Sequence, residues 1–183
     1  MIFGLFRTSA NRALIDRLYG ELVAAARQPA FYRDYGAPDT FEGRFELLAL
    51  HGALVVRRLN QTPAPGPDIA QDLSDGTFRN LDADIRESGV GDVAVPKRMK
   101  TMAQAFLGRA KAYDAALAPH DDAALATALA RNVYNSAREA DDADVARLTR
   151  YVRTVERDLA RLDAPALLRG IPFPDAAAIE AIS

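Results

Sequence analysis

The sequence predicts an all-α protein that folds as a single compact domain of about six or seven helices. Apolar residues recur at spacings of three and four along most of the chain, and no run of β-branched or aromatic residues alternates with period two. The 183 residues, of which 49% are hydrophobic, are enough for one core. Capping residues and short Pro/Gly-rich stretches divide the periodic segments into units of helical length.

The predicted helices begin after polar capping residues or at a proline. They cover residues 9–27, 39–60, 68–88, 96–117, 123–137 and 141–162, and a proline-rich tail with one helical turn follows. Ser9 or Asn11 caps the first helix. Asp39, with Glu42 three residues later, makes a capping box for the second. The third could break at Asp75-Gly76.

The later helices have caps that can be read directly from the sequence. Gly89 is suited to a left-handed C-terminal cap for helix 68–88. Asp121 or Asp122 can cap helix 123–137, and Asp141 or Asp142 can cap the helix that follows. These caps separate short loops from helices within one domain and give no sign of an interdomain linker.

Helix 39–60 carries Arg44, His51 and Arg58 at intervals of seven residues. At about 100° per residue they fall between two apolar surfaces, so this helix contacts protein on more than one side. The two surfaces consist of Phe41, Phe45, Leu48, Gly52, Val55 and Leu59, and of Leu47, Leu50 and Leu54. Carboxylate partners are expected, because a buried unpaired guanidinium costs several kcal/mol. The three cations belong either to an internal ion-pair network or to a partner-binding surface.

Charge is unevenly distributed in the middle of the chain. Residues 68–92 contain seven acids and two bases, whereas residues 93–113 contain five bases and no acid. The two segments could neutralise each other as antiparallel neighbours, or they could leave a cationic face open. Lys97, Lys100 and Lys111 face away from the apolar stripe of their helix. They are therefore available to a partner or to anionic lipid head groups, where each cation is worth about 1 kcal/mol.

Several kinds of active site are disfavoured. The chain has no cysteine, and its two histidines, His51 and His120, lack the spacing of metal ligands. There is no glycine-rich phosphate loop and no nucleophile elbow. We therefore predict no catalytic residue, no metal site and no cofactor. The enzyme alternative is a small all-α haem or metal enzyme that uses His51.

The net charge of −2 gives no general attraction to nucleic acid. The apolar N-terminal residues 2–6 are ended by Arg7 and are too few for a secretory signal or a membrane-spanning helix. They either fold onto the core or form a partner-seeking tail. These features favour a cytoplasmic protein.

Two blocks carry a resemblance to a known family: "FYRDYGAPDTFEGRFELLALHGALVVRRL" and "LDADIRESGVGDVAVPKRMKTMAQAFLGRAKAYDAAL". Together they resemble the ubiquinol-cytochrome c chaperone family, the assembly factors of the cytochrome bc1 complex in α-proteobacteria and mitochondria. The likeness covers about residues 10–118, and residues 119–183 match only as further helices.

The resemblance implies a non-catalytic chaperone that binds newly made cytochrome b, is peripheral at the inner (cytoplasmic) membrane, and could work with a second assembly factor. It implies no cofactor and no nucleic acid. The other alternative is a helical interaction module with an unrelated client. The matching residues expected to bind a partner are Tyr35, Phe41, Arg44, Phe45, His51, Asp82, Arg86, Asp92, Lys97, Arg98, Lys100 and Arg109.

Overall fold

The computed structural model describes residues 3–87, 95–118 and 121–179, with side chains over 11–83, 99–118 and 121–179. Within these ranges it contains eight α-helices, one 3₁₀ helix and no strand, which confirms the predicted all-α class. The elements are α1 (Phe3–Ala26), α2 (Pro29–Arg33), α3 (Phe41–Asn60), α4 (Gly66–Glu87), α5 (Val95–Leu117), α6 (Asp122–Asn132), α7 (Ala143–Ala160), α8 (Ala164–Arg169) and η1 (Ala176–Ala178).

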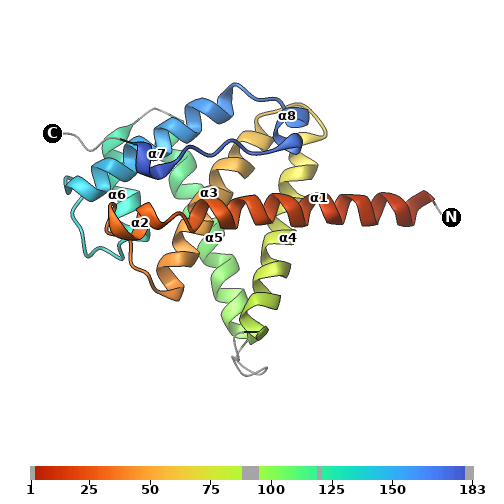
Figure 1. Ribbon diagram of the computed structural model, residues 1–183, viewed down its shortest axis with the longest axis horizontal. Helices are drawn as coiled ribbons and strands as arrows, with labels where there is room; N and C mark the ends of the chain where they lie inside the picture. The colour runs from red at the N-terminus through yellow and green to blue at the C-terminus, as the bar shows by residue number, and fades with distance from the viewer. Residues whose placement is uncertain (1–2, 88–94, 119–120, 180–183) are drawn as a thin grey trace.

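Helix α3 is the centre of the fold. It packs against α1, α4, α5 and α7, and Figure 1 shows α1 crossing α3, α4 and α5 on one side of the molecule. All of its residues from Phe45 to Val55 are buried. Both predicted apolar surfaces of this helix therefore pack against protein, except at Phe41, which is exposed.

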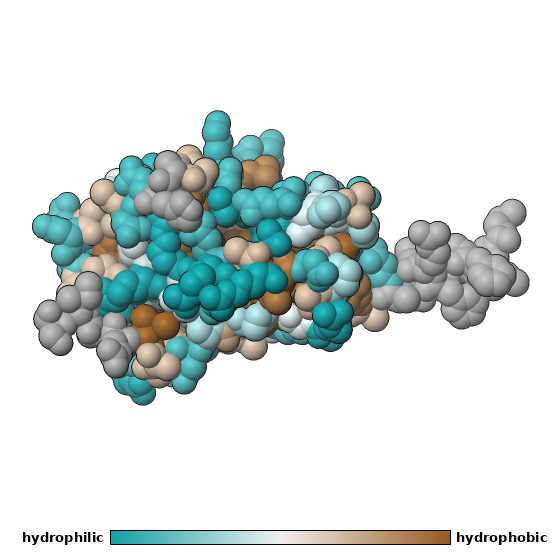
Figure 2. Space-filling model, turned by 90° about the horizontal axis from the view of Figure 1, so that it is seen from above, coloured by the Kyte–Doolittle hydropathy of each residue, from teal (hydrophilic) through white to brown (hydrophobic). Residues whose placement is uncertain are grey.

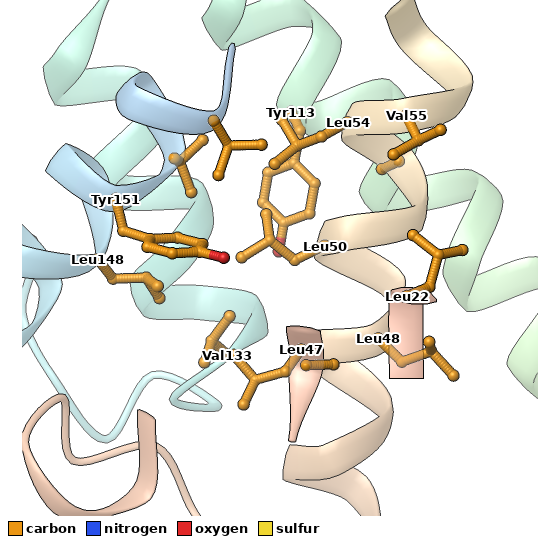
Figure 3. Packing of buried hydrophobic residues seen from close by; sticks show 14 of the residues in the cluster. Leu22, Leu47, Leu48, Leu50, Leu54, Val55, Tyr113, Val133, Leu148 and Tyr151 are labelled. Carbon is orange, nitrogen blue, oxygen red and sulfur yellow. The ribbon is translucent and has the colours of Figure 1, made fainter. Parts of the chain in front are cut away.

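One large apolar cluster occupies the middle of the molecule. Figure 3 shows side chains of α3, including Leu47, Leu50 and Leu54, together with Tyr113 of α5 and Tyr151 of α7. Along α7, apolar side chains at spacings of three and four residues are buried: Val145, Leu148, Val152, Val155 and Leu159. A smaller cluster joins α3 to α4 and α5 and comprises Phe45, Ala49, Leu81, Met102 and Phe106.

Several helix boundaries differ from the prediction. Helix α1 begins at Phe3, upstream of both predicted caps, and the side chains of residues 3–10 lie outside the described part of the chain. Residues 29–33, expected to be a break, form the short helix α2, with Pro29 in its first turn. Helix α6 ends at Asn132 and does not reach 137, because Asn135 and Ser136 adopt φ values of 50° and 57°.

Helix α4 begins at Gly66 and runs to Glu87 without the expected interruption at Asp75-Gly76. Gly76 is used for packing instead. A Cβ at this position would collide with Cγ2 of Ile15, so the glycine lets α1 cross close to α4. The cap predicted at Gly89 lies outside the described residues.

After α7 the chain returns across the molecule and is held there by several hydrogen bonds. Gln28 Nε2 donates to the carbonyl of Pro174 (3.1 Å), and Gln28 Oε1 accepts from the amide of Ala176 (2.7 Å). The hydroxyl of Tyr35 donates to the carbonyl of Ala176 (2.7 Å). The tail therefore closes over α2 as part of the domain.

Figure 2 looks down on the side where α7 and α8 lie in Figure 1, and it shows a face dominated by hydrophilic side chains with scattered apolar ones. Among the described residues, no helix is both long enough and apolar enough to cross a membrane.

Candidate functional site: an apolar groove with a cationic rim

The N-terminus of α3 is built by a short run of the first sequence block. Thr40 is the N-cap, and its side-chain oxygen accepts from the amide of Gly43 (3.1 Å). This corrects the capping box predicted at Asp39 and Glu42. Because the threonine caps the helix, Asp39 is available to accept from Nε of Arg44 (2.7 Å). Gly43 is required for space, since a Cβ there would collide with the carbonyl of Pro38.

Beside this helix start lies a hollow of about 320 Å³, which we call the α1–α3 groove. Its floor is largely apolar and comes from three helices that are distant in sequence. The apolar lining consists of Tyr19, Val23 and Ala26 of α1, Phe41, Phe45 and Leu48 of α3, and Leu81 of α4. Phe41 is 38% exposed, whereas Phe45 is 9% exposed, so the groove offers one aromatic ring at its edge and a second one at its base.

The rim of the groove is charged. A second hollow of about 570 Å³ shares Arg27, Asp39 and Arg44 with the first and adds Arg33. The lining of the two hollows thus contains three arginines and one aspartate. The hydrogen bond that Arg44 donates to Asp39 raises the pKa of Arg44, so this guanidinium stays charged. The Arg44 and Asp39 side chains are 54% and 55% exposed, which leaves both accessible to a bound molecule.

Two of the predicted partner-binding residues, Tyr35 and His51, lie in the core. Nδ1 of His51 is 2.7 Å from the carbonyl of Leu47, and Nε2 is 2.9 Å from the hydroxyl of Tyr151. The carbonyl can only accept, so Nδ1 carries the proton and the Tyr151 hydroxyl donates to Nε2. Burial lowers the pKa of His51 to about 4, which keeps the ring neutral. Tyr35 is also fully buried.

The cations on α3 do not form one ion-pair network. Arg44 pairs with Asp39 at the surface, while Arg58 donates to the carbonyl of Leu162 (2.9 Å from Nε). The expectation of carboxylate partners thus holds for Arg44, whereas His51 bonds a phenol and Arg58 a backbone carbonyl. They have different surroundings because a separation of seven residues spans about two helical turns, from the exposed start of α3 to its packed middle and end.

Arg109 of α5 is part of a two-armed ion pair. Its Nε and Nη2 lie 2.7 and 2.5 Å from the two carboxylate oxygens of Glu46. The Glu46 side chain is 10% exposed and the Arg109 side chain 27% exposed. This fork links α3 to α5 below the groove, and the hydrogen bonds raise the pKa of Arg109.

The remaining residues of the second block lie on α4 and α5 or in the turn between them. Asp82 follows Leu81 of the groove and is partly buried, and Lys100 is exposed on α5. Arg86, Lys97 and Arg98 belong to α4 and α5, but their side chains lie outside the described residues, and Asp92 lies outside them altogether. Helices α4 and α5 do pack together, as their opposite charges suggested.

The structure therefore brings together Phe41, Arg44 and Phe45 of the predicted set and places Leu81 from the second block beside them. The sequence prediction missed Arg27 and Arg33 on the rim. Arg27 directly follows α1 and Arg33 is the last residue of α2, but nothing in their spacing indicates that α1 and α3 converge there. In chemical terms, the groove can hold an apolar side chain or helix end next to an acidic group.

The comparisons with known proteins identify a family. A family model described as "Ubiquinol-cytochrome C chaperone" matches residues 33–176, a range that includes all of α3. The chain belongs to the ubiquinol-cytochrome c chaperone family. The match extends past residue 118 and includes α6 to α8, so the C-terminal helices are also part of the family pattern.

Two relatives connect this family to known proteins. Protein CBP3, mitochondrial, of Saccharomyces cerevisiae is 29% identical over 136 residues, which is 72% of this chain and 40% of that protein. The chain thus spans less than half the length of this relative. The crystal structure of the Cbp3 homolog from Brucella abortus is 39% identical, with a TM-score of 0.82, and the match covers 98% of this chain and 100% of the other.

Proposed function

We propose that this protein is a non-catalytic assembly chaperone that binds newly made cytochrome b and supports assembly of the cytochrome bc1 complex. Family membership supports the assembly role. The observation that supports client binding is the α1–α3 groove, because residues of the first family block form part of its apolar floor and part of its cationic rim.

The groove suits the end of an apolar helix. Partly exposed Phe41 can contact an apolar side chain of the client, which would gain about 25 cal/mol for each Å² of apolar surface removed from water. The rim arginines, Arg27, Arg33 and Arg44, face two aspartates, because Arg33 pairs with Asp34 and Arg44 with Asp39, so a surplus of one positive charge remains. They complement an acidic residue beside the client helix, and this pairing favours one orientation of the bound segment.

The proposed mechanism is reversible shielding. The chaperone binds loops or helix ends of cytochrome b before the other subunits arrive, and these subunits later displace it. Cytochrome b is a membrane protein, so we place the chaperone in the cytoplasm, peripheral at the inner membrane. Exposed Lys100 and Lys111 provide charges that anionic head groups attract. A second assembly factor belongs to the same proposal, and nucleic acid has no part in it.

The geometry of His51 speaks against the enzyme alternative. Both of its ring nitrogens already have hydrogen-bond partners in the core, so neither is directed at a substrate or metal. In the described residues, no group of three or more His, Cys, Asp or Glu side chains is arranged to hold a metal ion. A Soret band in the purified protein would contradict this assignment.

The test uses a strain that lacks this protein and is complemented with tagged variants. Phe41→Ala combined with Arg44→Ala removes one apolar and one cationic contact from the groove. The matched control combines Leu107→Ala with Arg161→Ala, because these side chains are 66% and 72% exposed and do not line the groove. Cytochrome b is measured by haem b difference spectrum in membranes and by recovery on the tag.

We expect the groove variant to recover about tenfold less cytochrome b than the wild type, which corresponds to a loss of about 1.4 kcal/mol in binding. The control should match the wild type, and both variants should melt near its midpoint. Normal cytochrome b in the strain without the protein would refute the function. Equal loss in the two variants would refute the groove as the client site.

A further inference from the structure

A second concave site lies between the C-terminal half of α3 and α7, away from the α1–α3 groove. It has a volume of about 770 Å³, within the range of small-molecule sites. Five arginines line it, and we call it the arginine cleft: Arg57, Arg58, Arg150, Arg153 and Arg157. None of them belongs to the residues that the family resemblance singled out.

Two of these arginines are held in place by a recessed carboxylate. Glu156, whose side chain is 13% exposed, accepts from Nη1 of Arg57 (3.3 Å) and from Nη1 of Arg153 (2.8 Å). Both guanidiniums are recessed as well, with side chains 17% and 19% exposed. This bridge between α3 and α7 fixes their positions before any ligand arrives, which lowers the entropic cost of binding.

The cleft carries a surplus of positive charge. Four acids lie in or beside the cleft, and three of its five arginines already pair with them. Arg57 and Arg153 share Glu156 and also contact Asp114 and Asp122, and Arg157 pairs with Asp158. Lys111 in the adjoining hollow brings the local surplus to two positive charges, in a chain whose net charge is −2. Arg58 is oriented by the carbonyl of Leu162, which is an uncharged acceptor, so this contact does not neutralise its charge. A local surplus of this kind attracts an anion from solution.

The number of guanidiniums and the apolar walls indicate which class of anion the cleft can bind. A carboxylate holds its two oxygens in one plane and is satisfied by one guanidinium fork, whereas the oxygens of a phosphate group are arranged tetrahedrally and can accept from several arginines at once. Leu54, Leu159 and Ala160 line the same cleft and can contact a carbon skeleton. We propose that the arginine cleft binds the phosphate group of a glycerophosphate ester, either as a soluble compound or as a phospholipid head group.

The binding test uses sn-glycerol 3-phosphate, titrated calorimetrically into the full chain at an ionic strength held constant with sodium chloride. The cleft variant is Arg58→Gln with Arg157→Gln, which leaves the Arg57–Glu156–Arg153 bridge intact. The control is Arg12→Gln with Arg161→Gln, which removes the same charge from side chains that are 68% and 72% exposed. Arg157→Gln alone, at a side chain 61% exposed, is the fallback if the double variant unfolds.

We expect the wild type and the control to bind the ester with equal affinity and the cleft variant to bind it at least about tenfold more weakly. Flotation with phosphatidylcholine vesicles, with and without phosphatidylglycerol, separates the two sources. Flotation that needs phosphatidylglycerol and the cleft arginines identifies a head group, and titration without flotation identifies a soluble ester.

Three results would overturn the proposal. The first is no binding of the ester or of phosphatidylglycerol vesicles by the wild type. The second is an equal loss of ester affinity in the cleft variant and the control, which would show that binding depends only on the net charge of the protein. The third is binding of a glutamate-rich peptide without binding of either phosphate probe, which would make the cleft a protein-docking site. None of these results depends on cytochrome b.

Discussion

Burial determines the chemistry of His51. Its ring contacts Phe31, Tyr151 and Phe173, with centroids 5.5, 5.6 and 5.0 Å away, and these neighbours are aromatic. A charged imidazolium would lose its hydration among them, which is why the pKa falls to about 4 in the folded protein. The unfolded chain has an ordinary histidine with a pKa of about 6.5.

This difference makes stability depend on pH. The folded-state pKa lies below the unfolded one, so between about pH 6.5 and pH 4 the unfolded chain binds a proton that the folded protein does not, and stability falls as the pH falls. We expect His51 to account for about 2 kcal/mol of the loss between pH 7 and pH 5. Urea unfolding of the wild type and of His51→Gln at both pH values measures it. Equal losses in the two proteins would contradict the assignment.

Two ion pairs of α3 are expected to contribute differently to stability. Arg109→Leu leaves the carboxylate of Glu46, 10% exposed, without its fork. We expect a loss of about 2–3 kcal/mol, smaller than for a fully buried pair because the guanidinium is 27% exposed. Adding Glu46→Leu should restore part of this loss, since it removes the buried charge. Arg44→Leu, at an exposed pair, should leave the unfolding midpoint nearly unchanged.

Chemical denaturation of the four proteins at pH 7 makes this comparison. A midpoint for Arg44→Leu as low as that for Arg109→Leu would show that the surface pair is structural. In that case the cytochrome b test in the α1–α3 groove would need Phe41→Ala alone.

The crossing of α1 and α4 depends on the absence of a side chain at Gly76. Replacing a helical glycine by alanine normally stabilises a helix by up to about 1 kcal/mol. At Gly76 the new Cβ would collide with Ile15, so we expect Gly76→Ala to destabilise by about 1–3 kcal/mol. Gly108→Ala on α5 is the matched control, because nothing lies within 4 Å of its Cβ position, and it should be neutral or stabilising.

Thermal melts of the two glycine variants test this directly. If Gly76→Ala melts at or above the wild-type temperature, α1 does not pack against α4 as closely as described. The same result would weaken the groove, since Tyr19 and Val23 on α1 form part of its floor.

Local signals predicted the helices well, and contacts between helices explain the departures. The apolar spacing on α3 and α7 indicated which faces are buried, and Asp121 and Asp142 cap their helices as expected. Gly76 looked like a break because a glycine lowers helix propensity, but its packing against Ile15 is invisible in the sequence. Likewise, Thr40 and Asp39 are both residues that often cap helices. In the structure Thr40 caps α3, while Asp39 pairs with Arg44, and this division is not visible in the sequence.

Only the groove residues that lie close together in the sequence could be predicted. Phe41, Arg44 and Phe45 lie within five residues of one helix, so one sequence block contains them. Their neighbours Arg27, directly after α1, and Leu81 of α4 lie far away in the sequence, and one sequence without an alignment does not show that these helices converge on α3. Part of the arginine cleft is visible in the sequence, because Arg150, Arg153 and Arg157 recur at spacings of three and four and therefore lie on one face of α7.

The C-terminal segment connects α1 to the part of the core around His51 and α7. Leu167 and Ile171 are buried against the large cluster, and Phe173 lies on the ring of His51. The amide of Ile171 donates to a carboxylate oxygen of Glu21 on α1 (2.8 Å), and Nε of Arg147 donates to the carbonyl of Ile179 (3.1 Å). This segment therefore covers residues that were expected from the sequence to meet a partner, Tyr35 and His51.

Removing residues 163–183 should consequently destabilise the entire domain. Exposing Leu167 and Ile171 alone costs about 1.5–3 kcal/mol each, and the lost hydrogen bonds add about 1 kcal/mol each. Tyr35→Phe is the graded control, because it keeps the buried ring and removes the hydroxyl that donates to the carbonyl of Ala176, which should cost about 1–3 kcal/mol. Urea unfolding monitored by far-UV circular dichroism and tyrosine fluorescence should show coincident transitions for the full chain, with midpoints falling in the order full chain, Tyr35→Phe, truncation. A truncated chain as stable as the full one would show that the core is complete at α7 and that Tyr35 and His51 can be uncovered for a partner without unfolding.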